Sequence, residues 1–402
     1  MENTLMFDRI LQAREVLKDV VRETPINDTS RLADDFELFV KMESLQKTGS
    51  FKIRGAFYKI YNLTEEEKSR GIIAASAGNH AQGVAYTAKK LGINATIVMP
   101  KDAPLQKVTN TASYGAEVEL YGNTFQEAYH HALELAKAHN LTFIEPYDDY
   151  DVIAGQGTIG LEILDQCPEV DVVFVPVGGG GLAAGVAIAI KTLKPTCKVY
   201  GVEAKNVNSM KKSIEDNELV GINNPKTIAD GIAVSKVGTK TYEICKKYLD
   251  GIIEVEDEAT SVAILTLLER SKIVSEGAGA ISVAAALSNQ VDLKGKKVVS
   301  ILSGGNIDVT LLSRLIDVAL RNLGRKVEIS TTIPDKPGAL AHLLEIISNT
   351  GANIIKISHN RLSKRVRIGS SAVNIELETL NSNHIERIVN LMEEQGFFVE
   401  IL

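Results

Sequence analysis

A lysine stands between two large apolar residues in the segment KTGSFKIRGA, at residues 47–56. Lys52 follows Phe51 and precedes Ile53. Burial among apolar groups disfavours the charged form of a lysine, so its pKa falls and the neutral amine becomes a nucleophile. The alternative is a surface lysine whose aliphatic stem lies over Phe51. Lys52 alone therefore identifies no chemistry, and support has to come from other segments.

A run of four glycines follows an apolar strand pattern in the segment VVFVPVGGGGLAAG and precedes a helix pattern. The run and the first residue of the helix are Gly178, Gly179, Gly180, Gly181 and Leu182. Unpaired backbone N–H groups at the positive end of a helix bind phosphate. The spacing of a dinucleotide-binding motif is not met, so a phosphate monoester fits better than a pyrophosphate. Glycines that only allow close helix–sheet packing are the alternative.

Two further loops place polar side chains at strand ends. In SAGNHAQG, Ser76 and Asn79 could bond a ligand or could cap the following helix. His80 could act as a base, but we favour a role in orienting this loop. In SGGN, Ser303 ends an apolar strand, where either a ligand contact or a turn explains it. With the lysine and the glycine run, these loops describe a site for an aldehyde cofactor held by its phosphate and its ring.

Strand patterns alternate with helix patterns along the first three quarters of the chain. Examples are GIIAAS before NHAQGVAYTAKKLG and DVVFVPV before GLAAGVAIAIKTL. This alternation predicts an α/β protein with parallel sheets and helices on both faces, in which ligands bind beyond the carboxyl ends of the strands. The loops selected by that rule are residues 76–80, 99–104, 177–181 and 303–306.

The pattern changes near residue 322. From residue 326 onward, the order of strand, helix, strand, strand, helix and strand predicts a separate βαββαβ unit of ferredoxin-like type. The uncharged stretch at 172–190 could be mistaken for a membrane span, but Pro176 and the glycine run divide it into a strand, a turn and a helix. We therefore expect no membrane segment.

Composition excludes other classes of protein. The chain has 402 residues, 45% of them hydrophobic and 24% charged, which is typical of a folded soluble protein. A net charge of -7 argues against nucleic acid as a partner. The cysteines Cys167, Cys197 and Cys245 show neither a disulfide framework nor zinc-site spacing. With a charged N-terminus that lacks a signal-peptide core, they lead us to expect a cytoplasmic protein.

Six motifs together resemble those of the threonine dehydratases, which are pyridoxal-phosphate enzymes of fold type II, the tryptophan synthase β family. The motifs are SFKIRGA, SAGNHAQGVA, IAGQGTIGLEI, VPVGGGGLAAG, TIADGIAV and SGGN. The tail TIPDKPGALAHLLEIISNTGANI resembles an ACT domain, an amino-acid-sensing module. The resemblance implies two open parallel-sheet domains in a catalytic region and a ferredoxin-like regulatory domain. Its boundaries would be a smaller lobe at about 50–150, a larger lobe at about 1–49 and 151–322, and an ACT domain at 326–402.

The resemblance also implies a role for each candidate residue. Lys52 would hold pyridoxal 5'-phosphate as a Schiff base, with a neutral amine, and would remove the α-proton of an amino-acid substrate. The implied cofactor contacts are Phe51 beside the ring, Asn79 on the ring hydroxyl, Ser303 at the pyridine nitrogen, and Gly178, Gly179, Gly180, Gly181 and Leu182 on the phosphate. The implied contacts of the substrate carboxylate are Ser76, Asn79 and His80.

The implied reaction is deamination of L-threonine to 2-oxobutanoate and ammonia, and of L-serine to pyruvate, in isoleucine synthesis or threonine catabolism. In the tail, a branched-chain amino acid such as isoleucine would be the effector, and its site would need two chains, as in a homodimer or homotetramer. Its implied contacts are Asp335, Gly338, Ala339, Leu340, Asn353 and Ile354. The alternative is that this turn only starts a helix and that the domain only dimerises.

Two departures from the family patterns bear on function. Close relatives have a His-Pro pair where this chain has EPYDD from Glu145, so the role of that loop is open. Serine racemases have a second serine where this chain has Ala77, so racemisation would lack a proton carrier. A racemase, a β-replacing enzyme of the same fold type and a non-catalytic amino-acid sensor remain as alternatives. The sequence settles no metal, and Glu203 is the candidate ligand of a cation.

Overall fold

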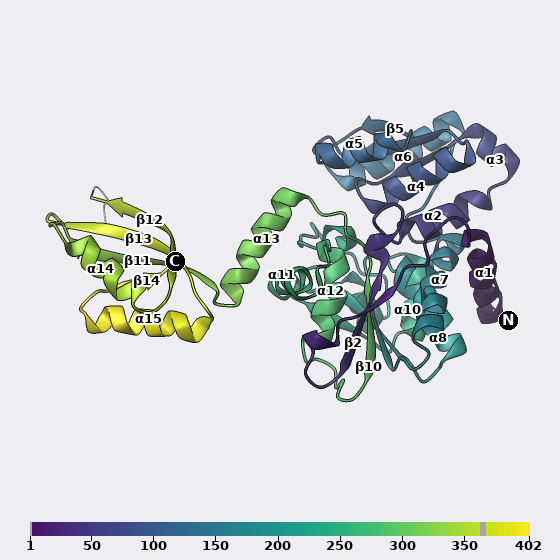
Figure 1. Cartoon of the computed structure of the whole chain (residues 1–402). Helices are drawn as coiled ribbons and strands as arrows, with labels where there is room; N and C mark the ends of the chain where they lie inside the picture. Colours follow the sequence, from purple (N-terminus) through teal and green to yellow (C-terminus); the bar gives the residue numbers. More distant parts are fainter. Residues whose placement is uncertain (1, 362–366) are drawn as a thin grey trace. The chain divides into compact units, whose positions relative to one another are not determined.

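The computed structural model describes residues 2–361 and 367–402 (Figure 1). The chain forms two compact units, Met1–Val309 and Thr310–Leu402. The first unit contains two sheets and the second contains one.

The larger sheet of the first unit has the strand order β1-β2-β10-β7-β8-β9. Its neighbours pair in parallel except for β1, which runs antiparallel to β2 at one edge. Every residue of β7 is buried, as expected for a central strand of a parallel sheet covered on both faces. The strands are β1 (Ile26–Asp28), β2 (Glu37–Met42), β7 (Val172–Pro176), β8 (Lys198–Ala204), β9 (Gly251–Val255) and β10 (Lys297–Leu302).

The smaller sheet has the strand order β5-β4-β3-β6, and all of its pairs are parallel. The expected α/β fold with two parallel sheets is therefore confirmed. The loops at residues 76–80 and 99–104 follow strands of this sheet, whereas those at 177–181 and 303–306 follow strands of the larger one. The strands are β3 (Ile72–Ala75), β4 (Ala95–Met99), β5 (Glu117–Leu120) and β6 (Thr142–Phe143).

Helices surround both sheets. In Figure 1, α7, α8 and α10 lie on one side of the larger sheet, and α11 and α12 lie on the other. No helix in the described parts of the chain is both long and apolar enough to cross a bilayer. The helices of the first unit are α1 (Glu2–Leu17), α2 (Lys52–Tyr61), α3 (Glu65–Arg70), α4 (Asn79–Leu91), α5 (Leu105–Ser113), α6 (Phe125–His139), α7 (Tyr150–Gln166), α8 (Gly181–Leu193), α9 (Ser209–Asp216), α10 (Thr239–Tyr248), α11 (Asp257–Thr266) and α12 (Gly277–Ala286).

The uncharged stretch at 172–190 forms β7 and α8, with the glycine run between them, as the sequence predicted. Gly180 has a φ of 95°, a left-handed conformation that residues other than glycine rarely adopt. The run thus turns the chain sharply from the end of β7 into the first turn of α8.

The second unit has the predicted βαββαβ order after its first helix. Its antiparallel sheet has the order β12-β13-β11-β14, which is the ferredoxin-like arrangement. Inward-facing residues alternate along β11 and β13 over a buried core that includes Leu343 and Met392. The elements are α13 (Val309–Asn322), β11 (Lys326–Pro334), α14 (Ala339–Ser348), β12 (Asn353–Asn360), β13 (Ser370–Glu378), α15 (Ser382–Glu394) and β14 (Val399–Ile401).

Helix α13 falls in the second compact unit, whereas the sequence interpretation placed residues 310–322 in the catalytic region. An ion pair of 3.0 Å between Asp317 of α13 and Lys326 of β11 ties the helix to the sheet that follows. The functional boundary at 322–326 stays a prediction.

Candidate active site

Lys52 is the first residue of α2, and its amine donates a hydrogen bond of 2.9 Å to the carbonyl oxygen of Pro146. Burial lowers the pKa of Lys52 to about 8, against the opposing effect of the Glu276 carboxylate. At pH 7 roughly a tenth of the amine is then neutral. Burial therefore shifts Lys52 toward the neutral form in the direction that the sequence predicted, and the neutral amine of the cofactor-bound enzyme stays a prediction.

The glycine run exposes a series of backbone donors. Among the residues that the structure describes, none accepts a hydrogen bond from the N–H groups of residues 178–183. The Thr241 hydroxyl donates to the Gly179 carbonyl at 2.6 Å, and a Cβ at Gly179 would lie 2.2 Å from the ring of Tyr147. The loop is thus fixed from two sides while its amides stay available, an arrangement that fits a phosphate group.

The loops at 76–80 and 303–306 meet at Asn79. Its amide nitrogen donates to Glu276 at 2.7 Å, and its oxygen accepts from Asn306 at 2.7 Å. The residue that caps α4 is Gly78, so neither Ser76 nor Asn79 is the helix cap that we considered. The Ser76 hydroxyl instead accepts the Gly78 N–H at 3.1 Å.

His80 is buried, and its Nε2 lies 3.1 Å from the carbonyl oxygen of Ile144. Burial, with a further contribution from the charge of Lys52, lowers the pKa of His80 to about 3. The ring is therefore neutral at physiological pH. Its fixed contact agrees with an orienting role more than with a role as catalytic base.

Ser303 is hydrogen-bonded to the residue before Lys52 in the chain. Its carbonyl oxygen accepts the Phe51 N–H at 3.1 Å, and its hydroxyl donates to the carbonyl of Ala278 at 3.0 Å. Lys52 and Ser303 are therefore brought together, as the sequence predicted. Leu182 is buried in the first turn of α8. The ring contact of Ser303 and the phosphate contact of Leu182 stay predictions.

The loop at 99–104 is hydrogen-bonded to a neighbouring loop of the smaller sheet. The Lys101 N–H donates to the Gly122 carbonyl at 2.9 Å. In α5, which follows this loop, Lys107 forms an ion pair of 2.7 Å with Asp230. Asp230 belongs to the TIADGIAV segment, which connects β8 to β9 of the larger sheet along the chain. This part of the site therefore links the two layers of the first unit.

Glu276 is the main site residue that sequence reasoning missed. It is buried directly before α12, and burial and the nearby charge of Asp230 raise its pKa to about 8. The available signal was a single carboxylate in the otherwise uncharged segment SEGAGA. A Cβ at Gly304 would lie 2.2 Å from Glu276 Oε1, so the first glycine of SGGN makes room for this carboxyl.

A buried ion network behind Lys52 was also missed. The Arg54 guanidinium pairs with Glu43 at 2.8 Å and with Glu162 at 2.6 Å, and Lys41 pairs with Glu162 at 2.6 Å. Arg54, Glu43 and Lys41 are fully buried. Arg54 lies in the same helical turn as Lys52, so this network fixes the start of α2.

Glu203, the candidate cation ligand, has both carboxyl oxygens engaged. They accept the N–H groups of Met210 and Lys211 at 2.9 Å each, at the start of α9. Burial raises the pKa of Glu203 to about 8. Within the described residues, no group of three or more His, Cys, Asp or Glu is arranged to hold a metal ion.

In the second unit, the predicted effector residues surround the turn before α14 and the start of β12. Gly338 has a φ of 87° and precedes α14. The Ala339 N–H donates to the Lys336 carbonyl at 3.3 Å, so this amide, which an effector carboxylate would need, is already engaged. Asp335 pairs with Arg361 at 2.9 Å. Asn353 donates to Glu378 at 3.1 Å, and Ile354 packs against the core of this unit.

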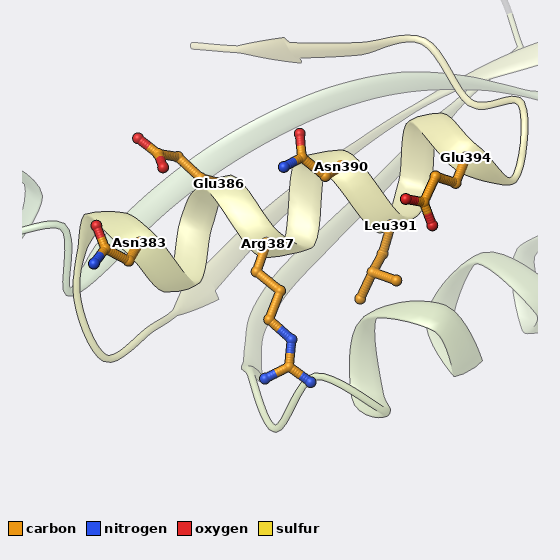
Figure 2. Close-up of a pocket in the computed structure, with 6 residues that line it drawn as sticks. All are labelled: Asn383, Glu386, Arg387, Asn390, Leu391 and Glu394. Carbon is orange, nitrogen blue, oxygen red and sulfur yellow. The ribbon is translucent and has the colours of Figure 1, made fainter.

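A hollow on the outer face of α15 involves none of these residues. Its lining side chains leave the helix at spacings of three and four residues, as Figure 2 shows. They are Asn383, Glu386, Arg387, Asn390, Leu391 and Glu394.

The fold and the site define an α/β enzyme with a buried lysine at the start of one helix and a glycine loop with free amides at the start of another, both in contact with residues 146–147. The chain belongs to the family described as pyridoxal-phosphate dependent enzymes, which matches residues 17–304. Its cofactor is pyridoxal 5'-phosphate, and the lysine, the free amides and Ser303 fit that group.

Full-length relatives are similar to the whole chain. An L-threonine ammonia-lyase of Thermotoga maritima is 50% identical over 400 residues, covering 99% of this chain and 100% of the relative. An L-threonine ammonia-lyase of Geobacter sulfurreducens is 42% identical over 401 residues, with the same shares of 99% and 100%.

Solved structures match about three quarters of the chain. The processed form of threonine deaminase isoform 2 from Solanum lycopersicum has a TM-score of 0.76 at 40% identity, covering 79% of this chain and 93% of that chain. Maize serine racemase has a TM-score of 0.74 at 34% identity, covering 79% and 98%. Because both activities occur on this fold, the fold alone does not select one.

Proposed function

We propose that this enzyme is an L-threonine ammonia-lyase that forms 2-oxobutanoate and ammonia, and that it also converts L-serine to pyruvate. The observation that supports this most directly is the buried Lys52 amine, with a pKa of about 8, which donates a hydrogen bond of 2.9 Å to the Pro146 carbonyl. The names of the two full-length relatives agree with it.

The cofactor, when bound, supplies an electron sink for the carbanion that loss of the α-proton leaves. Lys52 would accept that proton, and the β-hydroxyl would leave, so that the substrate loses one water in all; a pKa near neutrality suits Lys52 to this transfer. The amides of residues 178–183 hold the phosphate, and Ser303 offers a neutral hydroxyl to the ring nitrogen. Asn79, fixed by Glu276 and Asn306, bonds the ring hydroxyl.

The substrate carboxylate is bound at the start of α4 by Ser76, Asn79 and His80. The neutral ring of His80 positions this loop through Ile144 and does not compete with Lys52 for the α-proton. Positive charge from the helix end favours the anionic carboxylate there.

The alternative of a racemase needs a proton carrier on the face opposite Lys52. Ala77 has no ionisable or hydroxyl group, and it packs against the core of the smaller sheet. This favours elimination of the β-hydroxyl over racemisation. The combination of a low-pKa lysine and a fixed glycine loop also disfavours a non-catalytic sensor.

A turnover assay on L-threonine and L-serine tests the proposal. We expect ammonia with 2-oxobutanoate or pyruvate, loss of both activities in Lys52→Ala, and retention in Lys90→Ala, which changes an exposed lysine of α4. Formation of D-amino acid without ammonia would establish the racemase alternative. Absence of any threonine turnover in the cofactor-loaded enzyme would refute the proposed reaction.

We further propose that residues 326–402 are an ACT domain that binds a branched-chain amino acid such as isoleucine. This would place the enzyme at the first step of isoleucine synthesis or in threonine catabolism, as a homodimer or homotetramer in the cytoplasm. The ferredoxin-like sheet, the left-handed Gly338 before α14 and the three free cysteines support these assignments. Sedimentation of the purified chain tests the oligomer.

A further inference from the structure

The three residues 146–148 contact both ends of the candidate cofactor site. The Pro146 carbonyl accepts the Lys52 amine at 2.9 Å. The Tyr147 ring occupies the space beside Gly179, and the Tyr147 backbone lies 3.1 Å from where a Cβ at Gly181 would stand. Asp148 reaches a third element, the start of α10. The same short segment therefore touches the lysine, the glycine run and the helix behind that run.

Asp148 binds the first turn of α10 with both carboxyl oxygens. It accepts the N–H groups of Thr239 at 3.1 Å, Lys240 at 2.9 Å and Thr241 at 3.1 Å. The absence of a side chain at Gly238 allows this approach, because a Cβ there would lie 2.3 Å from the Asp148 carboxyl. A carboxylate at this position satisfies amides that the helix cannot satisfy itself and interacts favourably with its positive end.

Helix α10 in turn holds the glycine run. The Thr241 hydroxyl donates to the Gly179 carbonyl at 2.6 Å, and a Cβ at Gly180 would lie 2.8 Å from Thr241. The Gly238 N–H also donates to Gly179, at 3.5 Å. A displacement of the start of α10 would therefore move the carbonyl that fixes the orientation of the free amides at 178–183.

We propose that Asp148 is a positioning residue for the cofactor phosphate, acting through Thr241 on the glycine run while Pro146 and Tyr147 keep that run at a fixed distance from Lys52. The inference rests on the proposed assignment of the glycine run as the phosphate site. It gives a role to the EPYDD loop, which the sequence left open. Asp148 contacts no reacting atom and sets the geometry of the groups that do.

The test compares pyridoxal 5'-phosphate with pyridoxal, which lacks the phosphate, on the cofactor-free full-length enzyme. Cyanoborohydride fixes either aldehyde on Lys52, and mass spectrometry of the Lys52 peptide against aldehyde concentration gives an apparent affinity for each. The ratio of the two affinities measures the contribution of the phosphate alone. A general loss of structure changes both affinities and leaves their ratio unchanged.

Asp149→Asn is the matched control, since Asp149 caps a different helix by accepting the N–H groups of Asp151 and Val152 at the start of α7. We expect Asp148→Asn to lower the preference for pyridoxal 5'-phosphate over pyridoxal about tenfold and Asp149→Asn to leave it unchanged. Thr241→Val, which keeps the shape but removes the hydroxyl, should lower the preference as Asp148→Asn does.

An unchanged preference in both Asp148→Asn and Thr241→Val would overturn the role of Asp148 and leave the phosphate site intact. An equal loss in Asp149→Asn would overturn it as well, since the effect would then be a general one. A wild-type enzyme without any preference for the phosphorylated aldehyde would refute the phosphate site itself, and the role of Asp148 with it. If Asp148→Asn does not fold, Thr241→Val alone decides between these outcomes.

Discussion

Asn79 donates its side-chain amide to Glu276 at 2.7 Å, and this pair joins the loop after β3 to the start of α12. The contact depends on Gly304, because any side chain there would occupy the position of Glu276 Oε1. Asn306 fixes the other end of the Asn79 amide. Burial lowers the pKa of Lys52 and the charge of Glu276 opposes this shift, so one carboxyl both contacts Asn79 and acts on the protonation of Lys52.

Glu276→Gln should lower the pKa of Lys52 below its value of about 8, because the variant removes the carboxylate that stabilises the ammonium. Glutamine keeps an oxygen that can accept from Asn79, so the loop geometry should survive. We expect the pH midpoint of Lys52 acylation in the cofactor-free enzyme to fall, and the acylation rate to rise most near pH 8, where the Glu276 carboxyl of the wild type ionises.

The acylation rate of Lys52, measured on its peptide after digestion at a series of pH values, gives the pH midpoint of Lys52 deprotonation in the wild type and in each variant. Glu256→Gln, which changes a carboxylate paired with Lys205 at the surface, is the control and should leave the midpoint in place. An equal or higher midpoint in Glu276→Gln would contradict the electrostatic link between the two residues.

The buried neutral His80 should make the protein less stable in acid. Its pKa is about 3 in the folded protein and 6.5 when unperturbed, so between these values the unfolded chain binds the extra proton. Stability therefore falls as the pH falls through this window, by up to about 1.4 kcal/mol per pH unit for this one group. Glu203 and Glu276 have pKa values raised from 4.5 to about 8, so the folded chain binds more protons than the unfolded chain between these pH values. Their contribution to stability therefore falls as the pH rises through this range.

The contribution of His80 is isolated by comparison with His80→Gln. Urea unfolding of both proteins at pH values from 4.5 to 7 should give a free-energy difference that narrows toward acid pH, because only the wild type loses stability through this group. Parallel curves for the two proteins across that range would show that His80 is not buried as a neutral ring.

The sequence predicted the elements well because its signals are local. Strand patterns such as DVVFVPV and helix patterns such as GLAAGVAIAIKTL depend only on neighbouring residues, and they form β7 and α8. The βαββαβ order of the tail was likewise visible in its alternating strands. The antiparallel β1 was not predicted, since three residues at a sheet edge give little pattern.

The site was predicted in part, for a related reason. Loops at the carboxyl ends of strands follow from topology, so Asn79 and Ser303 could be placed together, and the family resemblance added Lys52 to them. The partners that tune them come from distant segments: Glu276 lies 197 residues after Asn79 in the chain. A lone buried carboxyl has no periodicity, and its opposing effect on the lysine pKa depends on a distance that only the fold sets.

Arg54 should be among the most costly residues to remove from the first unit. Arg54→Met leaves Glu43 buried without its partner and Glu162 with Lys41 alone, so we expect a loss of about 3–5 kcal/mol in the free energy of unfolding. Arg54→Lys keeps the charge but cannot contact Glu43 and Glu162 at the same time. Its free energy of unfolding should therefore lie between those of the wild type and Arg54→Met.

Urea unfolding of the cofactor-free enzyme measures this cost. Arg14→Met is the control, because the pair of Arg14 with Asp165 is half exposed and such pairs contribute about 0–1 kcal/mol. A cost for Arg54→Met no larger than that of Arg14→Met would mean that the buried network does not hold the start of α2.

Isoleucine or valine should change the apparent affinity of the enzyme for threonine about 5- to 150-fold if the second unit is a regulatory domain, the range expected for typical coupling between two sites. The proposed contacts include Asn353, whose amide now bonds Glu378. Asn353→Ala should remove most of the response, while Asn383→Ala, on the outer face of α15, should keep it (Figure 2). Calorimetry with isoleucine gives binding directly, and threonine titrations with and without isoleucine give the coupling.

If the wild type binds neither isoleucine nor valine, or if Asn383→Ala loses the response as fully as Asn353→Ala does, the assignment of the effector site is wrong. A wild type that binds isoleucine without any change in threonine affinity would leave the domain as a binding unit that is not coupled to the active site.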